Sequence, residues 1–334
     1  MRVIEMSNSP NTPFWVWGLL VAAVCGVSSA GALFQHVDSV PPLLRASWRL
    51  QLTSVVLMPF FVYQWIQQEP EIRQKMFEKN TVLILLGSGL ALALHFGSWV
   101  ASLDSTSLTH SLLFVTAHPI IIIVGMAILS LFVIGFRSPT RLEILGACIG
   151  FFGAAITLLD QGSQQGNHTV TLWGDTLAFM GAVFVVGYLV SGRILRKWMP
   201  IFLYAFPVTL IGALLLIPAS YAVEDDFSAF GVFGWTSLDY FPWFLALALI
   251  AGLLGHTGLN TCLRYISPLV ISTSVTLEPI LGSFIGWAFF GSGVPGKWTW
   301  VGGPILVIGV MLVIYGGFKV EHANPQTDSP TPLS

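Results

Sequence analysis

Two stretches of the chain decide the fold: residues 101–119 read ASLDSTSLTHSLLFVTAHP, and residues 261–279 read TCLRYISPLVISTSVTLEP. Laid on each other without gaps, they agree at five positions, namely Leu103/Leu263, Ser107/Ser267, Val115/Val275, Thr116/Thr276 and Pro119/Pro279. Farther on, the spacing of Gly146 and Gly153 returns as Gly302 and Gly309. These matches predict that the chain contains two copies of one unit.

The sequence around both stretches is strongly apolar. Of 334 residues, 54% are hydrophobic and only 9% are charged, whereas soluble chains average about 25% charged residues. Apolar windows of about 18 residues or more recur between Phe14 and Phe318, long enough for helices that cross a bilayer about 30 Å thick. The composition excludes a water-soluble domain and predicts an all-α, multi-pass integral membrane protein.

Turn residues and charges divide the chain into ten expected transmembrane helices: 14–35, 41–65, 81–103, 108–134, 140–159, 171–193, 200–220, 242–264, 269–291 and 298–318. A cleavable signal peptide is the competing interpretation of the first one. Four regions follow: a cytoplasmic stub 1–13, a first repeat 14–160, a second repeat 170–318, and a disordered tail 319–334. Because each repeat holds an odd number of helices, the second crosses in the opposite sense, as in carriers whose two gates alternate around a midplane site.

Basic residues predict the orientation. Eleven of the fourteen Lys and Arg residues fall on one side: Arg2, Arg73, Lys75, Lys79, Arg137, Arg141, Arg193, Arg196, Lys197, Arg264 and Lys319. Lys297 falls on the other, and Arg45 and Arg49 lie inside the second helix. By the positive-inside rule both termini are cytoplasmic. The loop with Glu224, Asp225, Asp226 and Asp239 and the glycosylation sequon at Asn167 then face outward. The plasma membrane, a bacterial inner membrane and an endomembrane all fit.

Other function classes lack support in the sequence. No long basic block suggests a nucleic-acid partner, and the three cysteines have no metal-cluster or disulfide spacing. The patterns GxxxxGK[ST], HExxH and GxSxG are absent. We therefore expect neither an enzyme nor a cofactor.

The chain resembles the EamA-like branch of the drug/metabolite transporter superfamily. The resemblance rests on the five-plus-five topology and on Pro42…Arg49, Trp99…Leu103…Thr106…Pro119 and Gly146…Gly153, and it covers both repeats. It implies a secondary transporter with a central cavity lined chiefly by the first, third, fourth, sixth, eighth and ninth helices. Family members often carry a Gly-Glu pair where the fourth and ninth helices end, whereas this chain reads Gly135-Phe136-Arg137 and Gly291-Ser292-Gly293. A role for that glutamate is therefore not carried over.

Two ionisable residues stand out as candidates for the site. His118 precedes Pro119 and Glu278 precedes Pro279, at matching places near the membrane midplane. Ionisable side chains at this depth cost about 2.5 to 3.5 kcal/mol each, so they need an interior partner or an aqueous cavity. The functional interpretation is that Glu278 binds a cationic group or a coupling proton and His118 adds hydrogen bonds. The alternative is a buried structural pair that holds the repeats together.

Six further residues complete the candidate substrate-binding set: Trp99, Asn260, His95, His256, Ser274 and Arg49. Helical spacing of four places His95 with Trp99, His256 with Asn260, and Ser274 with Glu278 on shared faces. Arg49 matches an arginine of the family's second helix, where helix packing explains it as well as substrate binding does. For the histidines, a bond to a neighbouring helix is equally compatible with the sequence.

These observations favour an alternating-access carrier of a small polar metabolite, such as an amino acid or amine, whose partners are the substrate, the bilayer and a coupling proton. The central spans hold no lysine and no clear midplane arginine, which favours a neutral, zwitterionic or cationic substrate. A nucleotide-sugar or phosphate-ester antiporter, which would need such cations, is the alternative. A non-transporting receptor or scaffold also stays open.

Overall fold

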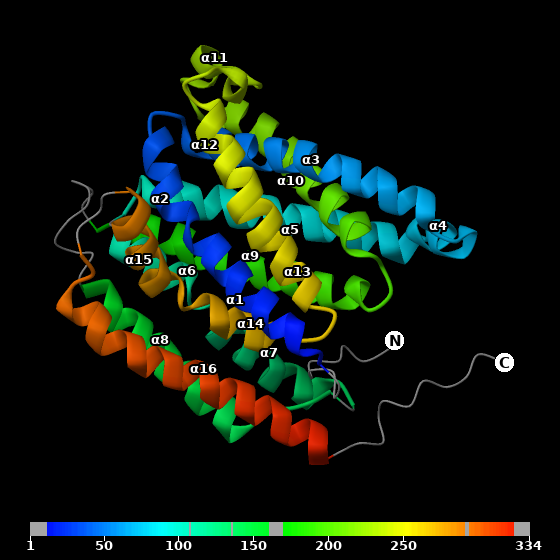
Figure 1. The fold of residues 1–334 in the computed structure, drawn as a ribbon, viewed down its shortest axis with the longest axis vertical. Coiled ribbons are helices and arrows are strands. Elements are labelled where there is room, and N and C mark those ends of the chain that lie inside the picture. The colour runs from blue at the N-terminus through cyan, green and yellow to red at the C-terminus, as the bar shows by residue number, and fades with distance from the viewer. Residues whose placement is uncertain (1–11, 107, 135, 160–169, 291–293, 324–334) are drawn as a thin grey trace.

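The computed structural model describes residues 12–106, 108–134, 136–159, 170–290 and 294–323, and this part of the chain is helical without strands (Figure 1). The first half contains α1 (Phe14–Ser28), α2 (Ala30–Phe34), α3 (Pro42–Gln67), α4 (Pro70–Met76), α5 (Lys79–Leu103), α6 (Leu108–Val115), α7 (His118–Phe132) and α8 (Arg141–Thr157). The second half contains α9 (Leu172–Arg196), α10 (Ile201–Val223), α11 (Phe227–Phe230), α12 (Phe241–Ala246), the π-helix η4 (Leu247–Thr257), α13 (Gly258–Cys262), α14 (Pro268–Val275), α15 (Glu278–Phe290) and α16 (Lys297–Ala323). Ser107, the sequon and most of both termini lie outside the described residues.

Each of the ten expected spans coincides with a helix or a run of helices. Seven are long and apolar enough to cross a membrane, and the bent pair α14 and α15 makes an eighth if it is one span. The remaining two expected spans are α3 and α8. Helix α8 has only 17 residues, whereas α3 is long but contains Arg45, Arg49 and Gln51. A multi-pass membrane protein is therefore supported, and the count of ten stays a prediction.

The helices of the two halves interleave. Helix α8 packs against α16, and α3 packs against α10, so the expected fifth and tenth helices meet, as do the second and seventh. Helix α5 packs on α9, while η4 and α13 pack on α1. If the two halves are exchanged, the third expected helix takes the place of the eighth, and the sixth takes the place of the first. The contact between the third and sixth helices then corresponds to the contact between the eighth and first helices. This is the arrangement that an inverted repeat requires, although the repeat itself remains an inference from the sequence.

The fourth and ninth expected helices both break at the matched prolines. In the fourth, α6 ends at Val115 and α7 begins at His118, and in the ninth, α14 ends at Val275 and α15 begins at Glu278. The axis bends by 43° at the second break. Each proline lacks the N–H that would continue the helical ladder, so the broken turn leaves carbonyl groups for other partners. His118 and Glu278 each open the helix that follows the break.

Helices α8 and α16 meet through glycines. A Cβ atom on Gly153 would lie 2.4 Å from the Leu306 nitrogen and 2.9 Å from the Gly302 oxygen. One on Gly309 would lie 2.3 Å from the Gly150 nitrogen and 2.6 Å from the Gly146 oxygen. The backbones are therefore too close for any larger residue, as in other membrane helix pairs with small residues at the contact. The glycine spacing seen in both halves thus pairs one half with the other.

Several arginines near the helix ends are buried and bound. Arg193 donates to the carbonyl oxygens of Leu263 (2.6 Å) and Ile266 (3.4 Å), and Arg196 Nε donates to that of Asn260 (3.1 Å). These cations satisfy carbonyl groups at and beyond the C-terminal end of α13, where positive charge is favourable. The sequence predicts both arginines in a cytoplasmic connection. In the structure they tie the end of α9 to the α13–α14 connection.

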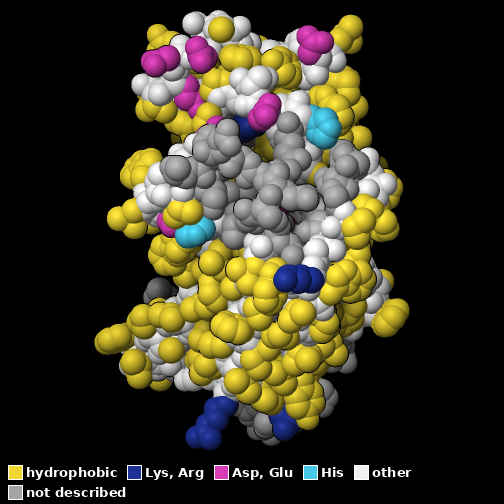
Figure 2. Space-filling model, turned by 90° about the vertical axis from the view of Figure 1, so that its left-hand side faces the viewer, with side chains coloured by type: hydrophobic (Ala, Val, Ile, Leu, Met, Phe, Trp, Pro, Cys, Tyr) yellow, Lys and Arg dark blue, Asp and Glu magenta, His cyan; other side chains and the backbone are white. Residues whose placement is uncertain are grey.

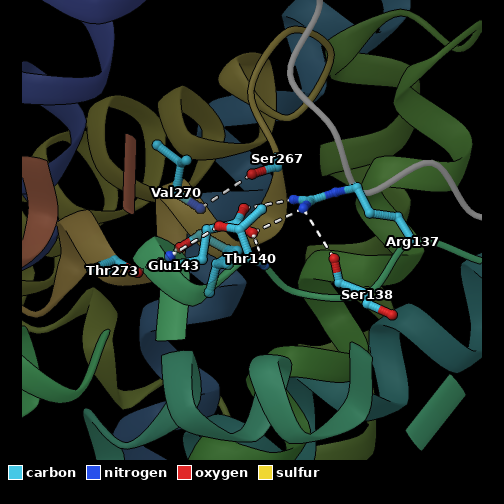
Figure 3. A network of polar contacts seen from close by, with 8 residues as sticks. Arg137, Ser138, Thr140, Glu143, Ser267, Val270 and Thr273 are labelled. Atoms are coloured by element: carbon cyan, nitrogen blue, oxygen red, sulfur yellow. Dashed lines mark hydrogen bonds and ion pairs between the residues drawn. The ribbon is translucent and has the colours of Figure 1, made fainter. Parts of the chain in front are cut away.

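A second charged group stabilises the start of α8. The buried Glu143 carboxylate accepts two hydrogen bonds from Arg137 (2.6 and 2.8 Å) and one from the Thr140 N–H (2.8 Å), as Figure 3 shows. The Thr140 hydroxyl in turn accepts the Glu143 N–H, which completes a capping box. Arg137, which the sequence predicts on the cytoplasmic side, is thus part of a structural network at the start of α8.

Acidic side chains are unevenly distributed over the surface of the molecule. Figure 2 views the left side of Figure 1, where acidic side chains gather at the α11 end; Asp225, Asp226 and Asp239 are exposed. Helix α4 and the C-terminal end of α16 lie at the opposite side of the molecule (Figure 1). The exposed acidic residues near α11 and the basic residues Arg73 and Lys75 of α4 therefore lie on different sides of the bundle (Figure 1).

We expect cysteines introduced at Asn8 and Gln326 to react with a membrane-impermeant maleimide only after the membrane is opened, because the basic residues place both termini in the cytoplasm. A cysteine at Asp226 should react in intact, right-side-out cells and serves as the control. Labelling of either terminal cysteine in intact cells would contradict the ten-helix topology.

Candidate functional site

A cavity lies beside the broken helices, with about 630 Å³ of space not filled by atoms, part of it open to solvent. Seven of the ten expected spans contribute to its wall: the first, second, third, fourth, sixth, eighth and ninth. Six of these are the helices that the family resemblance implied. The seventh is the second expected span, α3, which contributes Arg49 to the wall. Both proline breaks border the cavity, because His118 and Glu278 are among its lining residues. The matched positions of the two halves therefore meet at one site.

Glu278 presents a carboxylate to this cavity. It is the first residue of α15 and is half-buried. Its side chain makes no hydrogen bond or ion pair with the part of the chain that the structure describes. An ionisable group in a membrane span without a protein partner requires water or a ligand, because stranding its charge in an apolar medium is costly. Glu278 is thus the acidic group available for a ligand in this cavity.

His118 is buried in the same cavity but already has a partner. Its Nδ1 shares a hydrogen bond of 2.6 Å with the Ser272 hydroxyl on α14. The contact connects the break of the fourth span with the helix before the break of the ninth. No contact joins His118 directly to Glu278, so the structure does not contain the His118–Glu278 version of the buried pair considered from the sequence.

Arg49 also lines the cavity, which corrects the expectation that the cavity lacks a cation. Its side chain is 1% exposed, and its guanidinium lies over the rings of Phe96 (4.3 Å) and Phe34 (5.5 Å). Nε and Nη1 are buried without a hydrogen-bond partner. Depth along α3 could be estimated from the sequence, but the rotation of the helix, which decides what Arg49 faces, could not. An anionic substrate group is therefore no longer disfavoured by the lack of a cation.

The other aromatic and imidazole candidates form one wall. His95 Nδ1 donates to the Gly181 carbonyl (2.8 Å), and the His95 ring lies nearly parallel to Trp99, with centroids 6.2 Å apart. The Trp99 Nε1 and His256 Nδ1 atoms are buried without partners. All three residues line the cavity. His95 is thus held by a neighbouring helix, whereas Trp99 and His256 retain unused polar atoms.

Two predicted site residues do not line the cavity. Asn260 is buried and donates to the His256 carbonyl (2.7 Å) and to the Tyr188 hydroxyl. Ser274 donates to the Val270 carbonyl one turn earlier (2.8 Å). The spacing argument misplaced Asn260 because His256 lies in a π-helix, whose i→i+5 bonds change the angular period. It misplaced Ser274 because the helix breaks between Ser274 and Glu278.

Sequence reasoning missed Tyr188, Phe96, Thr116 and Ser272, which also line the cavity. Tyr188 carried a usable signal, since it is the one tyrosine within an otherwise apolar stretch of the sixth span. Phe96 carried none, because phenylalanine is common throughout the chain. Among the described residues no group of three His, Cys, Asp or Glu side chains is placed to hold a metal ion.

A helical, multi-pass membrane protein with a cavity bordered by two broken helices is the class defined by this fold and site. Residues 172–315 match the family model of the EamA-like transporter family. The resemblance drawn from the sequence is thereby confirmed for the second half.

One solved structure extends the likeness across both halves. This structure, described as "Crystal structure of protein", aligns with 90% of this chain and 97% of its own at a TM-score of 0.69 and 16% identity. At that identity the likeness concerns the fold alone. No match was found among curated proteins.

Proposed function

We propose that the protein is a secondary transporter that moves a small polar metabolite across a membrane by alternating access. The observation that carries the proposal is the unpaired Glu278 carboxylate in a central cavity, at the proline break of the ninth span. Broken helices lining a midplane site between two repeats are how many secondary transporters bind their substrates. The EamA-like match of residues 172–315 supports the same class.

The proposed organisation consists of two five-helix repeats, 14–160 and 170–318, that rock against each other. Glu278 binds a cationic group of the substrate or a coupling proton, and His118, held by Ser272, shapes the facing wall. Arg193 and Arg196 tie the end of α9 to the α13–α14 connection on the side that the sequence predicts to be cytoplasmic. The plasma membrane, a bacterial inner membrane or an endomembrane could hold the protein.

The alternatives make different demands on the cavity. A nucleotide-sugar or phosphate-ester antiporter would use Arg49 but would bring two or more negative charges close to Glu278. A receptor or scaffold would bind a ligand without moving it. We favour the carrier because the cavity is bordered by helix breaks in both halves, which a static binding site does not need.

Uptake into proteoliposomes tests the proposed function. Purified protein is reconstituted and presented with radiolabelled amino acids, amines, sugar phosphates and a nucleotide sugar, with and without an imposed proton gradient. We expect accumulation of at least one amino acid or amine above the level of protein-free vesicles. Binding of a solute without any flux or counterflow would identify a receptor and overturn the carrier.

A further inference from the structure

The cavity is lined by one acidic and one basic residue that form no ion pair with each other. Of its lining residues, Glu278 bears the carboxyl group and Arg49 the guanidinium group. No oxygen of Glu278 lies within 4.0 Å of an Arg49 nitrogen, and no other carboxylate among the described residues does so. We propose that the substrate is an amphoteric molecule, with a carboxylate bound to Arg49 and an amine bound to Glu278. This inference rests on the proposed function and specifies the substrate class of the same site.

The geometry around Arg49 leaves its hydrogen-bonding edge available. The rings of Phe96 and Phe34 lie against the guanidinium at 4.3 and 5.5 Å from its central carbon. A guanidinium donates hydrogen bonds in its own plane, so aromatic rings over its faces do not satisfy its N–H groups. Nε and Nη1 have no acceptor. Each of these two nitrogens shares an edge of the guanidinium with Nη2, and a carboxylate fits either edge because its two oxygens can accept two parallel N–H donors.

Comparison with Arg45 shows what Arg49 lacks: the Nε atom of each arginine is buried without a partner, but only Arg45 binds a carboxylate of the protein. Arg45, one turn earlier on α3, is equally buried, but its guanidinium binds both oxygens of Asp104 at 3.0 and 3.1 Å. Arg45 is not among the cavity-lining residues. The helix thus carries one arginine with a protein carboxylate and, four residues later, one without. A ligand carboxylate would accept hydrogen bonds from Arg49, as the Asp104 carboxylate does from Arg45.

Substrates with a single sign of charge satisfy only part of this site. A simple amine pairs with Glu278 but leaves the buried N–H groups of Arg49 without an acceptor. A simple carboxylic acid satisfies Arg49 but adds a second negative charge to a cavity that already holds Glu278. A phosphate ester increases that repulsion. An amino acid or a similar amphoteric metabolite satisfies both groups and leaves the cavity neutral.

The remaining walls indicate what else the substrate carries. His118 is bonded to Ser272 and His95 to Gly181, so neither imidazole Nδ1 is available. Val27, Ala30, Val185, Leu189 and Val275 supply much of the rest of the lining. An apolar side group attached to the amphoteric head would bury hydrophobic surface against them.

Binding of matched ligands to the purified full-length protein tests this inference. The twenty L-amino acids are first screened by thermal shift, because a ligand of the folded state raises the melting temperature. Leucine is then compared with 3-methylbutylamine and 4-methylpentanoate, and phenylalanine with phenethylamine and 3-phenylpropionate, which lack one charged group each. We expect at least one amino acid to bind about tenfold or more tightly than both of its truncated forms.

Two substitutions assign the charges. Arg49→Gln should weaken amino-acid binding about tenfold or more and should not weaken binding of the matching amine. Glu278→Gln should weaken amino-acid binding similarly and should not weaken binding of the matching acid, because it removes the carboxylate that repels this acid. Arg45→Gln is the control: it removes an equally buried arginine and should preserve the ratio of affinities even if the melting temperature falls. If one variant fails to fold, the comparison of each amino acid with its amine and its acid on the wild-type protein still tests the proposed substrate class.

Three results would overturn the inference: no amino acid shifts the melting temperature, an amine binds as tightly as its amino acid, or glucose 6-phosphate or UDP-glucose binds more tightly than every amino acid. These outcomes are separate from failure of the proposed function. Amino-acid binding without flux would leave the substrate class standing and remove transport. If an amine binds as tightly as its amino acid and is also transported, the proposed transport function stands and the amphoteric substrate class is wrong.

Discussion

Replacing Glu278 by glutamine is expected to reduce uptake to the level of protein-free vesicles. The substitution keeps the size of the side chain and removes its negative charge, and with it the attraction for an ammonium group or a proton. Because the carboxylate has no protein partner among the described residues, no structural contact is lost. We therefore expect the melting temperature to stay within about 2 °C of wild type. The measurement is initial uptake of the best-transported solute from the proteoliposome screen.

Glu143 provides the matched control for this variant. It is a buried carboxylate of the same chain, but Arg137 and Thr140 use its oxygens (Figure 3). Glu143→Gln should therefore lower stability by about 3 kcal/mol, because it leaves Arg137 without its carboxylate, while folded protein still transports. If Glu278→Gln behaves in the same way, Glu278 is a structural residue. If it transports at the wild-type rate with the wild-type pH dependence, the proposed role is wrong.

The second large effect is expected at the glycine contact between α8 and α16. Alanine at Gly153 would place its Cβ 2.4 Å from the Leu306 nitrogen and 2.8 Å from the Leu306 Cα, which are backbone atoms that no side-chain rotation can move. The two helices must separate, and the packing along their contact is lost. We expect Gly153→Ala to cost about 3 kcal/mol or more and Gly153→Val to prevent stable folding.

Thermal melting and size-exclusion chromatography of detergent-solubilised protein measure this effect. Gly125→Ala on α7 is the control, since a Cβ at Gly125 would meet nothing within 4 Å. It should leave the melting temperature unchanged or raise it, because alanine is the better helix former. A Gly153→Ala protein as stable as the Gly125→Ala protein would show that α8 and α16 do not pack as closely as described.

The amino-acid sequence by itself determined where the helices lie and which two of them contain the matched prolines. Apolar length is a local property, and a bilayer requires about 20 such residues for each helix. The breaks at Pro119 and Pro279 are equally local, because a proline lacks a backbone N–H wherever it occurs. For the same reason His118 and Glu278 could be recognised as a matched pair before the structure placed both at one cavity.

Only the tertiary structure decided which side chains face that cavity. The rotation of α3 brings Arg49 to it and leaves Arg45 with Asp104, although both arginines are on one helix. The π-helix before Asn260 and the break after Ser274 change the angular period that sequence spacing assumes. Helix rotation and local period result from packing against neighbouring helices, which are distant in sequence. A pattern read along one helix therefore gives the depth of a residue in the membrane but not the partner that it meets there.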